Sequence, residues 1–161
     1  MPDADRRERA IELWQQAYAC QMRKELDEAV ELYQESLALF PTAEAHTFLG
    51  WTYSFQGRLD EAIAECRKAI ALDPDFGNPY NDIGVYLIER GDLGGAIPWL
   101  EQAKRAPRYE PRHFPYLNLG RIYLRQGQWP EALRELEAAA RLAPGDPGTR
   151  KMLHEVRARF N

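Results

Sequence analysis

The chain has 161 residues, of which 45% are hydrophobic and 29% are charged, and these ordinary values argue against an intrinsically disordered chain. The formal net charge of −4 gives no reason to expect binding to nucleic acid or to an anionic membrane surface. The first ten residues are rich in charged side chains and lack an apolar core, and no apolar run reaches membrane-spanning length. Together with only two cysteines, these features predict a cytoplasmic location without membrane insertion.

A short block of sequence recurs along the chain. The block LDEAV at 26–30 returns as LDEAI at 59–63, as LGGAI at 93–97 and as WPEAL at 129–133. A second column, upstream of each block, holds the small residues Ala17, Gly50, Gly84 and Gly120. Turn positions hold Gly57, Gly91 and Gly127, and unit ends hold Pro41, Pro74 and Pro144. Each unit is therefore predicted to be a helix, a glycine turn and a second helix that proline ends.

This pattern resembles the tetratricopeptide repeat (TPR) family over roughly residues 10–146. The resemblance implies an all-α, right-handed α-solenoid of antiparallel helix pairs, in which stacking of the pairs creates the core. The predicted organisation is an N-terminal extension at 1–9, four repeats at 10–42, 43–76, 77–112 and 113–146, and a C-terminal cap helix at 147–161. The first repeat departs from the pattern, because Lys24 stands where the others have the turn glycine. The proline-rich segment KRAPRYEPRHFP, between the third and fourth repeats, is predicted to end one helix early.

The stretch WTYSF at 51–55 alternates large and small residues, as a half-buried strand would. Its place in the second repeat instead predicts a helix. Tyr53 then shares a stripe with Leu49 that packs into the stack, whereas Phe48, Trp51 and Phe55 lie on another face. The resemblance implies that this other face lines a concave groove.

The predicted groove is aromatic at its N-terminal end, rich in amides in the middle and basic at its C-terminal end. Its predicted peptide-binding residues are Trp14, Tyr18, Phe48, Trp51, Phe55, Asn78, Asn81, Asn118, Arg121 and Arg125. Five half-covered aromatic side chains would expose on the order of 500 Å². A patch of that size is often functional in a monomer. We expect the aromatic residues to anchor a peptide and the polar residues to orient it.

One known TPR function is excluded by the residues at the corresponding positions. Some TPR proteins clamp the C-terminal carboxylate of heat-shock chaperones with Lys, Asn and Arg side chains. This chain has Trp14, Tyr18 and Phe48 where that clamp needs Lys and Asn. We therefore expect no carboxylate-clamp chaperone partner.

The sequence offers no catalytic constellation. No pair of histidines or cysteines has metal-ligand spacing, so we predict no catalytic residue, metal or cofactor. Cys20 and Cys66 fall in core columns and are predicted to be buried small hydrophobic residues. Carboxylates such as Glu61, Glu65 and Glu101 are predicted to face solvent.

The sequence thus predicts a non-catalytic adaptor or scaffold that binds a peptide segment of a partner protein of unknown identity. Two alternatives stay open. The first is homo-oligomeric assembly, which an acidic first half and a basic second half would favour through head-to-tail contact. The second is a small TPR chaperone of the secretion type, which suits the length of the chain but rests on no matched motif.

Overall fold

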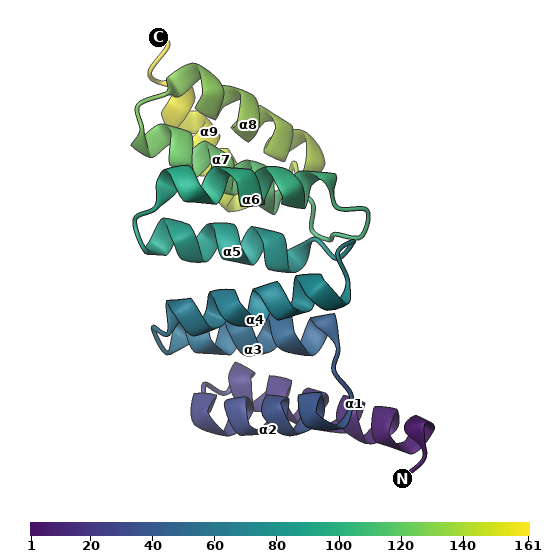
Figure 1. Cartoon of the computed structure of the whole chain (residues 1–161). Coiled ribbons are helices and arrows are strands. Elements are labelled where there is room, and N and C mark those ends of the chain that lie inside the picture. Colours follow the sequence, from purple (N-terminus) through teal and green to yellow (C-terminus); the bar gives the residue numbers. More distant parts are fainter.

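The computed structural model describes residues 1–161 as nine helices, which stack in chain order from the N-terminal to the C-terminal end (Figure 1). The helices are α1 (Asp3–Met22), α2 (Leu26–Leu39), α3 (Ala43–Phe55), α4 (Leu59–Leu72), α5 (Asn78–Glu89), α6 (Leu93–Arg105), α7 (Phe114–Arg125), α8 (Trp129–Leu142) and α9 (Pro147–Arg157). None of these helices combines the length and the apolar character needed to cross a lipid bilayer.

The helices form antiparallel pairs that pack on one another. The helices α1, α3, α5 and α7 each contact the even-numbered helix that follows, each pair contacts the next pair, and α9 packs on α8. The odd-numbered helices also contact one another directly, whereas the even-numbered helices do not. Successive pairs therefore lie closer together on the side of α1, α3, α5 and α7, which places these helices on the concave side of the stack. The predicted all-α solenoid of helix pairs is confirmed.

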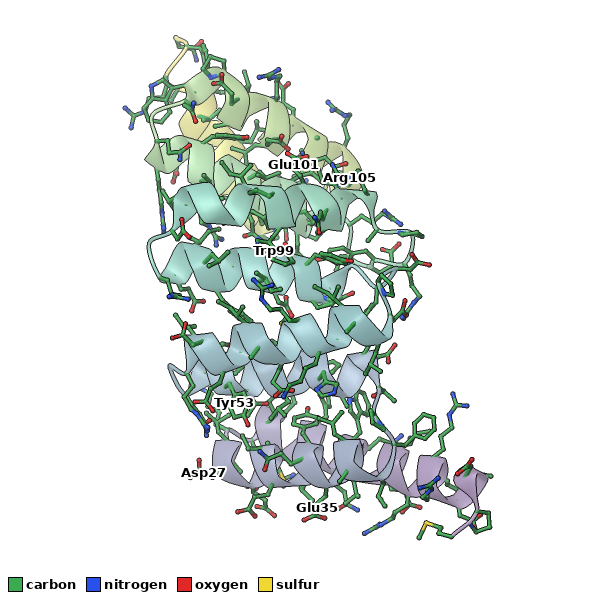
Figure 2. The ribbon with its side chains drawn as sticks, in the orientation of Figure 1. Asp27, Glu35, Tyr53, Trp99, Glu101 and Arg105 are labelled. Atoms are coloured by element: carbon green, nitrogen blue, oxygen red, sulfur yellow. The ribbon has the colours of Figure 1, made fainter.

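Small residues let the two helices of a pair approach closely. A Cβ atom added to Gly84 would lie 2.5 Å from Cδ2 of Leu100, and one on Gly120 would lie 2.7 Å from Cδ2 of Leu136. Both leucines are completely buried. Aromatic side chains also pack between successive helices, since Tyr53 is only 5% exposed and the Trp99 ring of α6 lies 6.3 Å from the Tyr80 ring of α5 (Figure 2).

The turn within each pair requires a left-handed backbone. Gly57, Gly91 and Gly127 have φ angles of 76°, 85° and 71°. The following amide closes the turn, as in the 2.9 Å hydrogen bond that Arg58 N–H donates to the Tyr53 carbonyl. In the first pair Lys24 takes the same conformation, with a φ of 62°. The turn is thus retained at this position without glycine.

Replacing Lys24 by glycine should stabilise the protein by up to about 1 kcal/mol, because a side chain is disfavoured in the left-handed region. Urea unfolding measures the difference. The matched control is Gln126→Gly, at an exposed helix end with a φ of −87°, where glycine brings no such relief. If the two glycine substitutions have the same effect, backbone strain at Lys24 is not the cause.

Most of the N-terminal extension predicted at 1–9 is helical and continuous with the first helix of the first repeat. Residues 3–9 belong to α1, which therefore projects beyond the second helix of its pair (Figure 1). Ser36 of α2 anchors α1 by donating a 2.7 Å hydrogen bond to the Ala10 carbonyl. The acidic residues Asp3 and Asp5 lie in the first turn, where the helix dipole favours negative charge.

Both cysteines lie in the core, as predicted. Cys20 and Cys66 are buried, unpaired thiols, and burial raises the pKa of each. The prediction for Glu65 is wrong, since its side chain is only 9% exposed. His46 Nδ1 of α3 lies 2.6 Å from Glu65 Oε2, and Lys68 Nζ lies 2.8 Å from Glu65 Oε1. This carboxylate therefore links the two helices of the second pair.

Glu65→Gln should cost about 1.5–3 kcal/mol of unfolding free energy at neutral pH, the usual range for hydrogen bonds to a charged group. Burial alone would raise the pKa of Glu65, but the bonds from His46 and Lys68 lower it below its ordinary value. A carboxyl whose pKa is lowered by folding stabilises the folded state at pH values above its ordinary pKa. That stabilisation is lost as the pH falls through the folded-state pKa.

Urea unfolding at neutral pH and near pH 3 measures this dependence. The difference between the wild type and Glu65→Gln should shrink at the acidic pH, because the stabilisation from a carboxylate with a lowered pKa is lost as the pH falls. Glu31→Gln, on an exposed position of α2, is the control and should have little effect at either pH. A Glu65→Gln deficit that is equal at both pH values would contradict the ion-pair explanation.

Candidate functional site

A continuous row of aromatic rings runs along α1 and α3. The ring centroids of Trp14 and Tyr18 are 6.0 Å apart, and Phe48 approaches both edge-on, at 5.3 and 5.6 Å. Trp51 lies 6.0 Å from Phe48, and Phe55 lies 5.4 Å from Trp51. We call these five residues the aromatic row. They are the five aromatic residues that the sequence predicted for the groove.

Much of the aromatic row is open to solvent. Tyr18 and Trp51 are each 38% exposed and Phe55 is 57% exposed, whereas Trp14 and Phe48 are partly buried. Together with Phe114 of α7, the three exposed members leave on the order of 300 Å² of aromatic surface accessible. This is less than the 500 Å² expected, because Trp14 and Phe48 are covered more than halfway.

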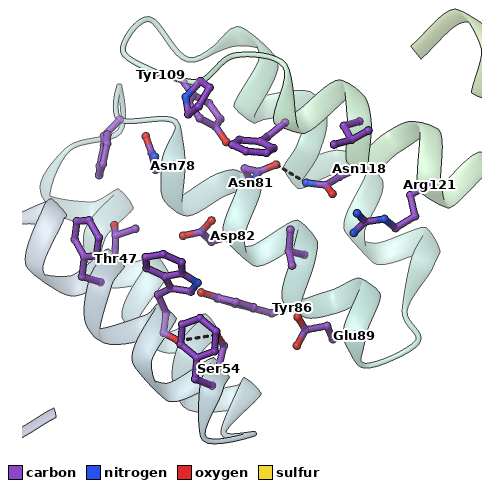
Figure 3. Close-up of a pocket in the computed structure, with 18 residues that line it drawn as sticks. Thr47, Ser54, Asn78, Asn81, Asp82, Tyr86, Glu89, Tyr109, Asn118 and Arg121 are labelled. Atoms are coloured by element: carbon purple, nitrogen blue, oxygen red, sulfur yellow. Dashed lines mark hydrogen bonds between the residues drawn. The ribbon is translucent and has the colours of Figure 1, made fainter. Parts of the chain in front are cut away.

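The row leads into a pocket of about 520 Å³ between α3, α5 and α7 (Figure 3). A volume of this order is typical of ligand sites in proteins. Seven of the ten predicted residues line the pocket: Phe48, Trp51, Phe55, Asn78, Asn81, Asn118 and Arg121. Three helices that are distant in the sequence thus contribute to one concavity.

Three predicted residues lie outside the pocket. Trp14 and Tyr18 belong to the aromatic row but do not reach the concavity, and Trp14 instead lines a smaller pocket of about 250 Å³ with Ile11 and Phe40. Arg125 is exposed at the end of α7, one turn beyond Arg121. The predicted basic end of the groove is therefore reduced to one lining residue, Arg121.

The amide side chains of Asn81 and Asn118, which we expected to orient a peptide, are buried and bond to each other. Asn81 and Asn118 are 6% and 5% exposed, and Asn118 Nδ2 donates a 3.0 Å hydrogen bond to Asn81 Oδ1. This bond joins α5 to α7 across the floor of the pocket (Figure 3). The pair therefore fixes the spacing of the two helices, in addition to lining the site.

One wall of the pocket comes from linker residues that sequence reasoning missed. Tyr109, Pro111 and Phe114 line it from the proline-rich segment and the start of α7. The linker is held by hydrogen bonds of 2.9 Å from Gly77 N–H to the Arg108 carbonyl and of 3.1 Å from Arg108 N–H to the Asp75 carbonyl. The two aromatic residues within this segment were the only available signal.

Close packing fixes the same wall against α5. A Cβ atom on Gly77 would lie 2.5 Å from Cδ2 of Tyr109, which is 4% exposed. The Arg108 guanidinium lies 4.5 Å from the centroid of the Phe76 ring and pairs with Glu44 at 3.1 Å. The linker thus forms a stable wall of the pocket.

The pocket contains one partly buried carboxylate that lacks a partner. Asp82 of α5 points into the concavity and has no ion-pair partner in the chain (Figure 3). Burial raises its pKa to about 7, although the Asn81 amide acts in the opposite direction. Nearby Tyr86 is 2% exposed, and its hydroxyl has no hydrogen-bond partner. The centre of the pocket therefore carries polar groups without partners.

A cluster elsewhere has the composition of a metal site. One ligand atom each from Cys20, Glu25 and Glu28 lies within 4.8 Å of the others. However, Arg23 Nε already pairs with Glu25 at 2.9 Å, and Cys20 is buried with a raised pKa. The cluster therefore has neither a free carboxylate pair nor a reactive thiolate to offer.

Stacked helix pairs with a concave, partly apolar groove define the class of helical-repeat interaction modules. Two family models, both described as tetratricopeptide repeat, match residues 8–75 and 113–146. The chain belongs to the tetratricopeptide repeat family, whose repeats serve as protein-interaction modules.

Curated relatives share part of the chain. It is 35% identical over 106 residues to the TPR repeat-containing protein PA4299 of Pseudomonas aeruginosa, covering 65% of this chain and 42% of that protein. It is 33% identical over 106 residues to protein FlbA of Caulobacter vibrioides, covering 63% of this chain and 16% of that protein. The chain spans less than half the length of these relatives.

Solved structures share the fold. PilF of Pseudomonas aeruginosa matches with a TM-score of 0.90 at 23% identity, covering 97% of this chain and 71% of that one. YrrB, described as a TPR protein with an unusual peptide-binding site, matches with a TM-score of 0.69 at 22% identity, covering 94% of this chain and 77% of that one. At such low identities the comparison shows a shared fold and gives no information on a shared ligand.

Proposed function

We propose that the chain is a non-catalytic adaptor or scaffold that binds a peptide segment of a partner protein along the aromatic row and in the adjoining pocket. The observation that carries this proposal is the exposure of Trp51 and Phe55 on the concave side, beside a pocket that three helices share. The core does not require these two rings to be aromatic, because Leu49 and Tyr53 of the same helix already fill the stack.

The accessible area limits the strength of the proposed interaction. Covering on the order of 300 Å² of apolar surface at roughly 25 cal/mol per Å² gives about 7–8 kcal/mol before losses. Association itself costs an estimated 4–15 kcal/mol. The aromatic surface alone therefore supports weak to micromolar binding. Tighter binding would require additional free energy from polar contacts within the pocket.

Self-association is a second candidate function, favoured by the acidic first half and basic second half of the chain. Exposed charges are screened within about 8–10 Å at physiological salt, so head-to-tail assembly should weaken as salt rises. Light scattering at low salt and high protein concentration tests this candidate directly. A monomeric mass under those conditions would contradict self-association.

We further propose a cytoplasmic location, which accords with two unpaired cysteines.

Selection from a library of short random peptides displayed on phage tests the proposed function. The wild type should enrich peptides that then fail to bind Trp51→Ala. The control is Leu72→Ala, which removes an even more accessible apolar side chain, 49% exposed, at the end of α4. Enrichment of the same peptides on wild type and Trp51→Ala would contradict a role for the aromatic row.

A further inference from the structure

We propose that the pocket accepts a lysine or arginine side chain of the bound peptide, with Asp82 as its counter-ion and aromatic rings as its walls. This inference rests on the proposed function, because it specifies the chemistry of the peptide that the groove binds. It predicts a basic residue flanked by apolar residues, since the pocket adjoins the aromatic row.

The position of Asp82 is the first argument. Its side chain projects from the middle of α5 toward the centre of the concavity, between Tyr109 and Tyr86 (Figure 3). Arg121, the only cationic residue that lines the pocket, lies on α7 beyond Asn118 and pairs with no carboxylate of the chain. The carboxylate of Asp82 is thus left without a counter-charge.

Desolvation is the second argument. A carboxylate that loses water without gaining a cation is costly, and its pKa rises, as that of Asp82 does. The neighbouring Cys66, Tyr86 and Tyr109 also have raised pKa values, so they stay neutral near pH 7. An entering ammonium or guanidinium group would compensate this partly buried charge and keep Asp82 ionised.

The surrounding groups favour a cation over other ligands. Aromatic faces attract Lys and Arg cations, and the aliphatic stem of such a side chain packs on apolar rings such as Trp51. Asp82, together with Glu89 at the pocket edge, disfavours an acidic or phosphorylated residue.

Five peptide mixtures test the inference. They are N-acetylated and C-amidated, identical in their randomised apolar positions, and differ only in a fixed central residue: lysine, arginine, norleucine, glutamine or glutamate. Capping removes the terminal charges, so that the central side chain is the only variable. Fluorescence anisotropy of labelled mixtures measures binding to the wild type and to Asp82→Asn, at pH 5.5 and at pH 8.

For the wild type at pH 8, the lysine and arginine mixtures should bind at least about tenfold more tightly than norleucine, a difference of roughly 1.4 kcal/mol, with glutamate weakest. The preference should shrink at pH 5.5, where Asp82 is mostly protonated. Asp82→Asn should remove the preference at both pH values while it still binds the norleucine mixture.

Stability is measured alongside binding. Asp82→Asn removes a desolvated charge, so its melting temperature at pH 8 should equal or exceed that of the wild type. Equal binding of all five mixtures to the wild type would overturn the basic-residue inference and leave the peptide-binding proposal standing. If none of the mixtures binds, the peptide-binding proposal fails as well. Comparing the glutamate and norleucine mixtures with the lysine and arginine mixtures on the wild type measures the charge preference even if Asp82→Asn does not fold.

Discussion

Tyr53→Ala is expected to lower the free energy of unfolding by about 3–5 kcal/mol, the range for a large core aromatic. The ring is 5% exposed and lies between successive helix pairs (Figure 2). Its hydroxyl accepts a 3.2 Å hydrogen bond from Gln34 Nε2, and the Arg58 guanidinium lies 4.3 Å from its centroid. Removing the ring therefore leaves a cavity between the first and second pairs and takes one contact away from each of Gln34 and Arg58.

Urea unfolding monitored by circular dichroism measures this loss. Trp51→Ala, two residues along the same helix, is the matched comparison and should cost much less, because its ring is 38% exposed and packs mainly on Phe48 and Phe55. If Trp51→Ala destabilises the protein as much as Tyr53→Ala, the aromatic row is part of the core.

Gly84→Ala should destabilise the third pair by about 1–3 kcal/mol, the usual cost of overpacking. The added methyl group would lie 2.5 Å from Cδ2 and 2.6 Å from Cγ of Leu100. Leu100 is completely buried, so a shift of its side chain must displace neighbouring core residues. The close approach of α5 and α6 would have to widen.

Gly94→Ala is the control for this substitution. Gly94 lies in α6 with no heavy atom within 4 Å of its added Cβ, so alanine should be neutral or gain up to about 1 kcal/mol of helix propensity. The double variant Gly84→Ala with Leu100→Ala should lose less than the sum of its single losses. Additive losses would show that the clash is not the cause.

The helix pairs could be predicted because packing demands small residues at fixed intervals. Gly84 and Gly120 lie where a side chain would collide with the facing helix, and Gly57 lies where the backbone needs a positive φ. Such requirements act within one repeat unit and recur in the next, so a single sequence displays them. Lys24 shows the limit of the rule, because the turn forms there without its usual residue.

The site could be predicted only in part, because its details depend on contacts between repeats. Periodicity placed Glu65 on the surface, and only the neighbouring helix shows that His46 covers it. Asn81 and Asn118 fall in neighbouring columns of the repeat, and nothing in the sequence states that the two amides meet. Tyr109 lies in an irregular linker whose path is set by hydrogen bonds to the preceding repeat.

Binding of one peptide, selected on the wild type, to Phe55→Ala and Phe160→Ala tests the central claim most directly. The two phenylalanines are 57% and 53% exposed, but only Phe55 belongs to the aromatic row. Phe55→Ala should weaken binding by about 30-fold, as expected for an interface anchor worth roughly 2 kcal/mol, with little change in melting temperature. Phe160→Ala should bind like the wild type. Equal affinities for the two variants would contradict the account that the aromatic row is the binding surface.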